Sequence, residues 1–127
     1  AIIVTNQPVI ARNLCSMEEL ESIHKKLETL LGNEGAFINA IYFCPHHPDG
    51  GFPEERKEYK IKCECRKPAA GMFLLASHEW NINLEESFMI GDNQRDIDAG
   101  KNAGLKDSFL IETNSKNALL DTVKSII

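Results

Sequence analysis

Two pairs of potential metal ligands, separated by a long polar segment, constrain this sequence more than any other feature. Cys44 and His46 are two residues apart, and so are Cys63 and Cys65. The segment between the pairs, residues 48–62, contains Gly and Pro and has little apolar periodicity. Such a segment buries too little apolar surface to fix its own shape. A four-coordinate metal with nitrogen and sulfur ligands would fix it.

Zn²⁺ is the metal that this ligand set favours, because thiolate and imidazole ligands suit tetrahedral zinc. All four positions would be taken by the protein, so the site would be structural. His46 is favoured over His47 as the fourth ligand, since a Cys-x-His spacing mirrors the Cys-x-Cys spacing. The alternative is a pair of buried cysteines with a surface histidine. We name residues 44–67 the cysteine loop and expect it to bind zinc.

Length and charge limit the possible functions. The chain has 127 residues, enough for one domain with a single core, and a formal net charge of −5, which disfavours general binding to nucleic acid. No apolar run is long enough to span a bilayer, and the first residues lack the layout of a signal peptide, so we expect no membrane association. Three of the four cysteines lie in the cysteine loop, which favours a reducing, cytoplasmic setting. Because the sequence begins inside an apolar run, we expect residues 1–127 to form a single, N-terminally incomplete domain.

Short apolar runs alternate with amphipathic segments, which predicts an α/β fold with a parallel sheet and helices on both faces. Ser16 and Glu19 form a capping-box pattern, while Gly32 and Gly104 suit helix C-termini. The predicted strands cover residues 1–5, 36–43, 86–90 and 108–111. The predicted helices run from 16 to 31, from 68, from 94 to 102 and from 115. The cysteine loop is an insert in this pattern.

Parallel sheets bind ligands at the carboxyl ends of their strands, and three predicted strands end in polar groups. These groups are Thr5, Asn6 and Gln7 after the first strand, Cys44 after the second, and Gly91, Asp92 and Asn93 after the third. Asp92 is predicted to bind Mg²⁺ directly, since Mg²⁺ takes few protein carboxylates and keeps water and phosphate oxygens. Asp96, one helical turn later, either supports that metal site or orients Lys67, or it only complements the helix dipole.

Several side chains near these strand ends suit a phosphate. Thr5 and Asn6 offer a hydroxyl and a backbone N–H for a phosphate oxygen. Lys67 supplies a compact positive charge for a phosphoryl group, and Arg66 supplies a bidentate fork for a second phosphate or a carboxylate. Taken singly, these residues would be turn, cap or surface positions. Their convergence is what predicts a phosphate site.

Four motifs together resemble the haloacid dehalogenase superfamily, and within it the D-glycero-D-manno-heptose 1,7-bisphosphate phosphatase and histidinol-phosphatase branch. They are Val4-Thr5-Asn6-Gln7, Cys44-Pro45-His46-His47-Pro48-Asp49-Gly50, Cys63-x-Cys65-Arg66-Lys67-Pro68-x-x-Gly71-Met72 and Gly91-Asp92-x-x-x-Asp96-x-x-Ala99-Gly100. The resemblance covers nearly the whole chain. It implies a Rossmann-like domain that hydrolyses phosphomonoesters through an aspartyl-phosphate, with Mg²⁺.

The resemblance also implies roles for individual residues. Thr5 would bind the transferring phosphoryl group, Lys67 would neutralise it, and Asp92 would hold Mg²⁺. The zinc ligands would be Cys44, His46, Cys63 and Cys65. The residues in contact with substrate would be Asn6, Gln7, Arg12 and Arg66, and those supporting the Mg²⁺ site would be Asn93 and Asp96.

Two departures from the family pattern matter. The motif Asp-x-Asp-Gly-Thr, whose aspartates act as nucleophile and as general acid and base, is absent, and covalent phosphoryl transfer needs that first carboxylate. In the family its strand lies at the sheet centre, between the strands that end at Thr5 and Asp92, so its omission would leave strand edges without partners. Residues 8–13 read Pro-Val-Ile-Ala-Arg-Asn in place of Ser-Gly-Ile-Ala-Arg-Gly. This variant resembles versions that are fused to, or paired with, a sugar nucleotidyltransferase.

We weigh three functions for the chain. The favoured one is a Mg²⁺-dependent phosphatase of a sugar bisphosphate, here without its nucleophile, with histidinol phosphate as the alternative substrate within the branch. The second is a zinc-stabilised, catalytically silent module that binds a phosphosugar or a partner domain. The third is a nucleic-acid end phosphatase, which shares the Thr-Asn-Gln motif but is disfavoured by the acidic balance of the chain.

Overall fold

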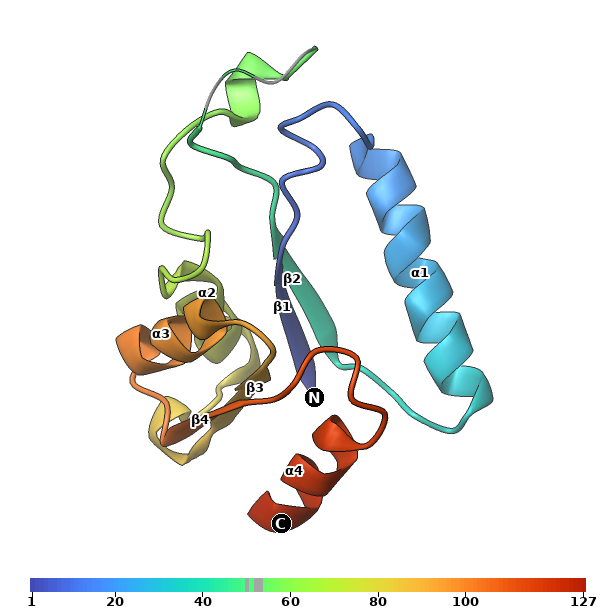
Figure 1. Ribbon diagram of the computed structural model, residues 1–127, viewed down its shortest axis with the longest axis vertical. Coiled ribbons are helices and arrows are strands. Elements are labelled where there is room, and N and C mark those ends of the chain that lie inside the picture. The colour runs from blue at the N-terminus through green and yellow to red at the C-terminus, as the bar shows by residue number, and fades with distance from the viewer. Residues whose placement is uncertain (50, 52–53) are drawn as a thin grey trace. The chain divides into compact units, whose positions relative to one another are not determined.

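Each of the two units of the chain is built on a pair of parallel strands joined through a helix (Figure 1). The computed structural model describes residues 1–49, 51 and 54–127, so residues 50, 52 and 53 of the cysteine loop lie outside the described part. Unit 1 covers Ala1–Arg66, and unit 2 covers Lys67–Ile127. The elements of unit 1 are β1 (Ile2–Asn6), α1 (Met17–Asn33), β2 (Ala40–Cys44) and the short 3₁₀ helix η1 (Lys57–Tyr59). Those of unit 2 are α2 (Gly71–Trp80), the 3₁₀ helix η2 (Leu84–Glu86), β3 (Phe88–Gly91), α3 (Gln94–Ala103), β4 (Asp107–Leu110) and α4 (Ala118–Ile126).

The strands of unit 1 end at the same edge. β1 and β2 run parallel, with Ile2 opposite Ala40 and Asn6 opposite Cys44. Their β-branched and aromatic residues suit extended backbone. The backbone N–H of Gln7 donates to the Cys44 carbonyl oxygen at 2.8 Å and extends the pairing by one step. The start of the cysteine loop therefore lies beside the polar end of β1.

The second strand is shorter than the sequence predicts. It was expected over residues 36–43 but begins at Ala40, and the side chain of Phe37 is 82% exposed. The partner strand gives the reason, because β1 begins at Ile2, which pairs with Ala40. Residues 36–38 lie beyond the start of β1, and only the Asn39 N–H continues the ladder, with a 2.8 Å bond to the Ala1 carbonyl oxygen.

The capping box predicted for the first helix is confirmed. The Glu19 N–H donates to Ser16 Oγ at 3.1 Å, and the Ser16 N–H donates to Glu19 Oε2 at 2.7 Å, so two donors at the helix start are satisfied. The predicted end near residue 31 was wrong, because α1 continues through Gly32 to Asn33. The chain turns at Gly35, whose φ of +76° favours glycine.

In unit 2, β3 and β4 run parallel, with Phe88 opposite Asp107 and Gly91 opposite Leu110. The connecting helix α3 begins after the cap residue Asn93 and ends at Gly104, whose φ of +79° makes it the left-handed cap that the sequence predicts. The side chains that α3 buries against the strands include Ile97, Ala99 and Ala103. A right-handed β-α-β connection is the usual way to join parallel strands.

The helix that was predicted from residue 68 begins at Gly71. Two further segments of unit 2 also start later than the sequence predicts. The third strand begins at Phe88 rather than residue 86, because residues 84–86 form η2, which Asn83 caps by accepting the Glu85 N–H at 3.2 Å. The last helix begins at Ala118 rather than residue 115. A turn precedes it, in which the Ser115 N–H donates to the Glu112 carbonyl oxygen at 3.3 Å. In both places a local turn competes with the longer element.

The α/β class with parallel pairing is confirmed by both units. The described strands form two sheets of two strands each, in the orders β1–β2 and β3–β4. Among the described residues, no helix combines the length and the apolar character that are needed to cross a lipid bilayer.

Gly100 permits the close contact between α3 and β4. A Cβ atom at this position would collide with Ser108 Oγ and press on Leu105 and Met89. We therefore predict that Gly100→Ala lowers the free energy of unfolding by about 1–3 kcal/mol, because an extra methyl group overpacks a close contact. Chemical denaturation monitored by circular dichroism measures this change.

The matched control is Gly32→Ala in α1, where a Cβ atom would meet nothing within 4 Å. That variant should keep its stability or gain up to about 1 kcal/mol, because alanine has the higher helix propensity. Equal effects of the two substitutions would show that the contact at Gly100 is not limiting.

Candidate functional site

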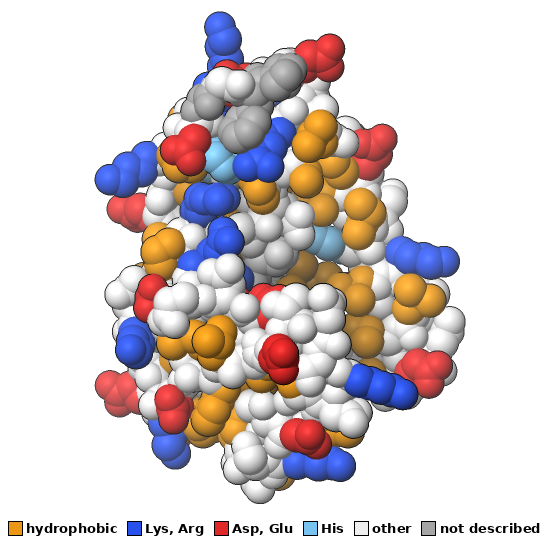
Figure 2. All heavy atoms as spheres, in the orientation of Figure 1, with side chains coloured by type: hydrophobic (Ala, Val, Ile, Leu, Met, Phe, Trp, Pro, Cys, Tyr) orange, Lys and Arg blue, Asp and Glu red, His pale blue; other side chains and the backbone are white. Residues whose placement is uncertain are grey.

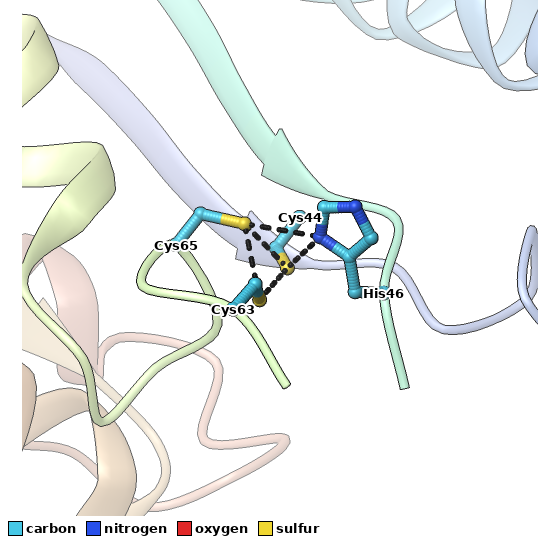
Figure 3. A group of neighbouring side chains, drawn as sticks. All are labelled: Cys44, His46, Cys63 and Cys65. Carbon is cyan, nitrogen blue, oxygen red and sulfur yellow. Dashed lines mark hydrogen bonds between the residues drawn. The ribbon is translucent and has the colours of Figure 1, made fainter. Parts of the chain in front are cut away.

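Four side chains converge in the cysteine loop. Cys44 is the last residue of β2, His46 follows two residues later, and Cys63 and Cys65 lie where the loop returns. Figure 3 shows the three Sγ atoms and His46 Nδ1 directed toward one another, and the four ligand atoms lie within 4.8 Å of each other. The closer pairs are 2.9–3.5 Å apart: Cys65–Cys44 at 2.9 Å, Cys65–Cys63 and His46–Cys65 at 3.3 Å, Cys44–Cys63 at 3.4 Å and Cys44–His46 at 3.5 Å.

The cluster suits a tetrahedral metal ion better than a disulfide. All four cysteines of the chain are free thiols. With zinc–sulfur bonds of about 2.3 Å, the sulfur atoms of a tetrahedral site lie roughly 3.8 Å apart, somewhat farther than the 2.9–3.4 Å found here. Three sulfur ligands and one nitrogen ligand form one of the common structural zinc sets. All four positions are supplied by the protein, so such a site leaves none open for substrate.

The thiols of the cluster differ in acidity. Burial raises the pKa of the Cys44 thiol, and burial also raises that of Cys65. For Cys63 burial acts in the same direction, but hydrogen bonds from Cys65 and from the Arg66 N–H outweigh it, so the pKa is lowered. Since metals bind thiolates, Cys44 and Cys65 must lose protons when the cluster takes up a metal.

The two adjacent histidines have different neighbours. His46 joins the thiols, whereas His47 is 6% exposed and its Nε2 lies 3.2 Å from an Nη2 of Arg12. The Arg56 N–H, from the cysteine loop, also donates to the Ala11 carbonyl oxygen at 2.7 Å. The loop is therefore joined to residues 8–13, the segment that departs from the family pattern.

Arg66 is fixed by the cluster on two sides. Its backbone N–H donates to Cys63 Sγ at 3.4 Å, and its Nη1 donates to the His46 carbonyl oxygen at 3.2 Å. Figure 2 shows Lys and Arg side chains gathered over the cysteine-loop end of unit 1. This end of unit 1 therefore carries positive side chains, although the chain as a whole is acidic.

At the end of β1, the side chain of Gln7 is hydrogen-bonded to the Thr5 hydroxyl. Gln7 Nε2 donates to Thr5 Oγ1 at 3.2 Å. That bond occupies an acceptor lone pair of the hydroxyl, so the hydroxyl proton is directed elsewhere. Asn6 lies opposite Cys44 in the strand register. The end of β1 can therefore donate hydrogen bonds to an anion.

In unit 2, Asp96 pairs with Lys67 and lies at the capped start of α3, while its support of a Mg²⁺ site stays a prediction. Its Oδ1 lies 2.6 Å from Lys67 Nζ, and both side chains are only 8% exposed. Its Oδ2 accepts the Asn93 N–H at 3.1 Å, which completes the capping box of α3. Gly91 makes this possible, because a Cβ atom there would collide with the Asp96 side chain.

Asp92 follows β3 and is exposed. Thr113 Oγ1 donates to its Oδ2 at 3.3 Å. The sequence analysis missed Thr113, although a signal was present, since parallel strands end at one edge and Thr113 follows the predicted fourth strand. The backbone N–H of Ile111 donates to the Gly91 carbonyl oxygen at 2.9 Å and carries the chain to that edge.

The predicted site residues fall into two groups. Unit 1 holds Thr5, Asn6, Gln7, Arg12, Arg66 and the four cluster residues, and unit 2 holds Lys67, Asp92, Asn93 and Asp96. The geometry within each group is described above. That the two groups form one phosphate site stays a prediction.

Removing one partner of the Lys67–Asp96 pair should destabilise the chain strongly. We predict that Lys67→Met and Asp96→Asn each lower the free energy of unfolding by about 3–5 kcal/mol, because either change leaves a buried charge without its partner. The double variant should lose less than the sum of the two, since it buries no lone charge. A double-mutant cycle by urea denaturation measures the coupling.

The exposed pair Lys25–Glu21 is the control, because its side chains are 71% and 67% exposed. Glu21→Gln should leave the stability essentially unchanged, as expected for a surface ion pair. Additive losses at Lys67 and Asp96 would contradict the importance of the pair.

Comparison with known proteins shows what the chain is similar to. A family model described as HAD-hydrolase-like matches residues 64–123. The D-glycero-beta-D-manno-heptose-1,7-bisphosphate 7-phosphatase of Yersinia pestis is 39% identical over 112 residues, which are 88% of this chain and 57% of that protein. A D-glycero-alpha-D-manno-heptose-1,7-bisphosphate 7-phosphatase of Photorhabdus laumondii subsp. laumondii is 37% identical over 125 residues, which are 94% of this chain and 66% of that protein.

A solved structure agrees with these relatives. The crystal structure of D,D-heptose 1,7-bisphosphate phosphatase from B. bronchiseptica, complexed with magnesium and phosphate, superposes with a TM-score of 0.74 and 31% identity. The match covers 94% of this chain and 61% of that one. The chain thus spans about three fifths of the length of the relatives it matches. It is similar to the HAD-hydrolase-like family over residues 64–123 and to the heptose 1,7-bisphosphate phosphatases over most of its length.

Proposed function

We propose that this chain carries the phosphate-binding, Mg²⁺-binding and zinc-binding parts of a phosphomonoester hydrolase that acts on D-glycero-D-manno-heptose 1,7-bisphosphate. The observation that carries the proposal is the buried Lys67–Asp96 pair at 2.6 Å, anchored at the start of α3 just after Asp92. A buried lysine held by a carboxylate is a fixed positive charge, which suits a phosphoryl group in transfer. The solved relative from B. bronchiseptica binds magnesium and phosphate, which supports the same ligands here.

Each residue would have a distinct part in the reaction. Asp92 would hold Mg²⁺, with Asn93 and Asp96 in support, and the bound ion would neutralise charge on the phosphate oxygens. Thr5 would donate its hydroxyl to a phosphoryl oxygen, while Lys67 would balance the charge of that group. The residues proposed to contact the rest of the substrate are Asn6, Gln7, Arg12 and Arg66. The sequence has no Asp-x-Asp-Gly-Thr motif to supply the nucleophile, so the 127 residues alone should show little or no turnover.

The zinc of the cysteine loop would be structural in this proposal. Cys44, His46, Cys63 and Cys65 would fill its coordination, so it cannot bind the attacking group. Its effect on function would be indirect, through the position of Arg66, which bonds to the cluster on two sides. A cytoplasmic setting and a role in carbohydrate metabolism go with the proposal, since zinc-binding thiols persist where cysteines stay reduced. A fused or paired sugar nucleotidyltransferase remains a proposed partner on the basis of residues 8–13.

A catalytically silent, zinc-stabilised module is the second candidate. The observation in its favour is the cluster of Cys44, His46, Cys63 and Cys65, which can stabilise the fold without an open position for chemistry. Such a module would use the same cations to bind a phosphosugar without hydrolysing it. Phosphate release distinguishes the phosphatase from the silent module, whereas substrate binding is expected of both.

The test is hydrolysis by the chain extended with an opening strand that carries Asp-x-Asp-Gly-Thr. We expect this protein to release inorganic phosphate from heptose 1,7-bisphosphate only with Mg²⁺, and Asp92→Asn to lower kcat/KM by at least about 100-fold, because a metal ligand is lost. Asp98→Asn should retain activity, since this carboxylate accepts a hydrogen bond only from the nearby Gln94 side chain on the same helix among the bonds described.

Two results would count against the phosphatase. Tight binding of the bisphosphate without phosphate release would favour the silent module. If the zinc-loaded protein neither binds the bisphosphate nor releases phosphate from it, both candidates are ruled out.

Zinc content tests the cysteine loop directly. We predict about one zinc per chain by elemental analysis, and a large loss in Cys63→Ser, because a thiolate ligand is removed. Cys15→Ser is the matched control and should keep the metal, since Cys15 lies outside the cluster.

Zinc affinity should fall as the pH falls, because the raised pKa values of Cys44 and Cys65 favour the protonated thiols that cannot bind metal. Zinc-free protein from an unchelated preparation, or affinity that does not depend on pH, would contradict the assignment.

A further inference from the structure

We propose that His47 is a positioning residue that holds the guanidinium of Arg12 toward a phosphate group of the substrate, and that it is not a zinc ligand. The proposal rests on the proposed function for the identity of the substrate. Its structural basis lies within unit 1, where the two adjacent histidines diverge. His46 Nδ1 lies 3.3 Å from Cys65 Sγ, whereas His47 Nε2 lies 3.2 Å from Arg12 Nη2.

Both ring nitrogens of His47 have hydrogen-bonding neighbours. A guanidinium has donors and no acceptor, so the contact at 3.2 Å with Arg12 Nη2 is a hydrogen bond in which His47 Nε2 accepts. On the other side of the ring, Nδ1 lies 3.1 Å from the Asp49 backbone nitrogen and 3.3 Å from the Asp49 carbonyl oxygen. The ring is therefore held at both nitrogens.

The cysteine loop holds His47 in place. The backbone N–H of His47 donates to the Tyr59 carbonyl oxygen at 3.0 Å, and its side chain is 6% exposed. The same loop reaches residues 8–13 through Arg56, whose N–H donates to the Ala11 carbonyl oxygen and whose Nε donates to Asn13 Oδ1, each at 2.7 Å. Three bonds thus join the loop to that turn, and His47 provides the one that reaches the Arg12 side chain.

Burial and backbone hydrogen bonds hold the turn at residues 8–13 in place. Ile10 and Ala11 are 0% and 1% exposed, so the backbone before Arg12 is packed in the core of unit 1. The Arg12 N–H donates to the Pro8 carbonyl oxygen at 3.0 Å, and the Leu14 N–H donates to that of Val9 at 2.9 Å. The backbone position of Arg12 is thereby set by the turn, and the direction of its guanidinium is set by His47.

An imidazole nitrogen suits an arginine that binds an anion. A carboxylate in the place of His47 would also orient the guanidinium, but it would cancel its charge. The bond to the imidazole nitrogen orients the group without bringing a negative charge to it. The side chain that is held here is the one predicted to contact a doubly phosphorylated substrate.

The test uses zinc-loaded protein and four variants. His47→Phe keeps the ring volume but removes the acceptor, and His47→Gln restores an acceptor for Arg12. His46→Phe is the adjacent-histidine comparison, and His78→Phe, on the exposed face of α2, is the control for the substitution itself. The readouts are zinc content, hydrogen exchange at the amides of residues 12–14, and the Kd for heptose 1,7-bisphosphate by calorimetry.

We expect His47→Phe to keep its zinc, to exchange the amides of residues 12–14 about tenfold faster and to bind the bisphosphate about tenfold more weakly, as for a lost hydrogen bond to a charged group. His47→Gln should restore exchange and binding to within about threefold of the parent chain, because it supplies the acceptor. His46→Phe should lose zinc, and His78→Phe should change nothing. Rescue by glutamine would not be expected if only the shape of the ring mattered.

Three outcomes would overturn the proposal: zinc loss in His47→Phe, unchanged exchange and binding in that variant, or a glutamine variant as impaired as phenylalanine. If the parent chain binds no bisphosphate while exchange follows the expected pattern, the positioning of Arg12 by His47 stands and the substrate assignment fails. The two ideas are thereby separated.

Discussion

The convergence of Cys44, His46, Cys63 and Cys65 is the constraint on which the rest of unit 1 depends. The segment between the two ligand pairs has a single short 3₁₀ helix among its described residues and little buried apolar surface, so packing alone does not fix it. The cluster is anchored at one end by β2, whose last residue is Cys44. From there its position determines that of Arg66 through two hydrogen bonds and, through His47, that of the Arg12 guanidinium. The cluster is thus linked by hydrogen bonds to two arginines that are proposed to bind an anion.

Unit 2 depends on one carboxylate in a comparable way. Asp96 uses one oxygen to cap α3 and the other to pair with Lys67, and the absence of a side chain at Gly91 gives it the space to do so. Capping and ion pairing are often treated as competing explanations of an acidic residue near a helix start. Here the two contacts support each other, because the capping bond holds the carboxylate in the position from which it pairs with the lysine. The lysine is then buried at a lower cost than a charge without a preformed partner.

The parts of the fold that the sequence predicts well are those that are decided within a few residues. The Ser16–Glu19 capping box, the glycine cap at Gly104 and the parallel α/β class all follow from local chemistry and hydrophobic periodicity. The errors arise where a distant partner decides. The second strand begins at Ala40 because its pairing with β1 begins there, and neither Thr113 beside Asp92 nor His47 beside Arg12 can be located from spacing alone. Ligand spacing favours His46 for the cluster, but the direction of the neighbouring ring depends on how the loop folds over residues 8–13.

The acidic character of the chain favours a small phosphorylated substrate. With a net charge of −5, long-range attraction does not collect anions, so any phosphate must be bound by individual cations at short range. The cations singled out here are each held by a different kind of partner: Lys67 by a buried carboxylate, Arg66 by the cluster and Arg12 by an imidazole nitrogen. Of these partners, only the carboxylate carries a full opposite charge, so the lysine is fixed in position but its charge is balanced. The two arginines keep their charge. This difference is expected if the lysine contacts the phosphoryl group in transfer and the arginines contact the part of the substrate that stays bound.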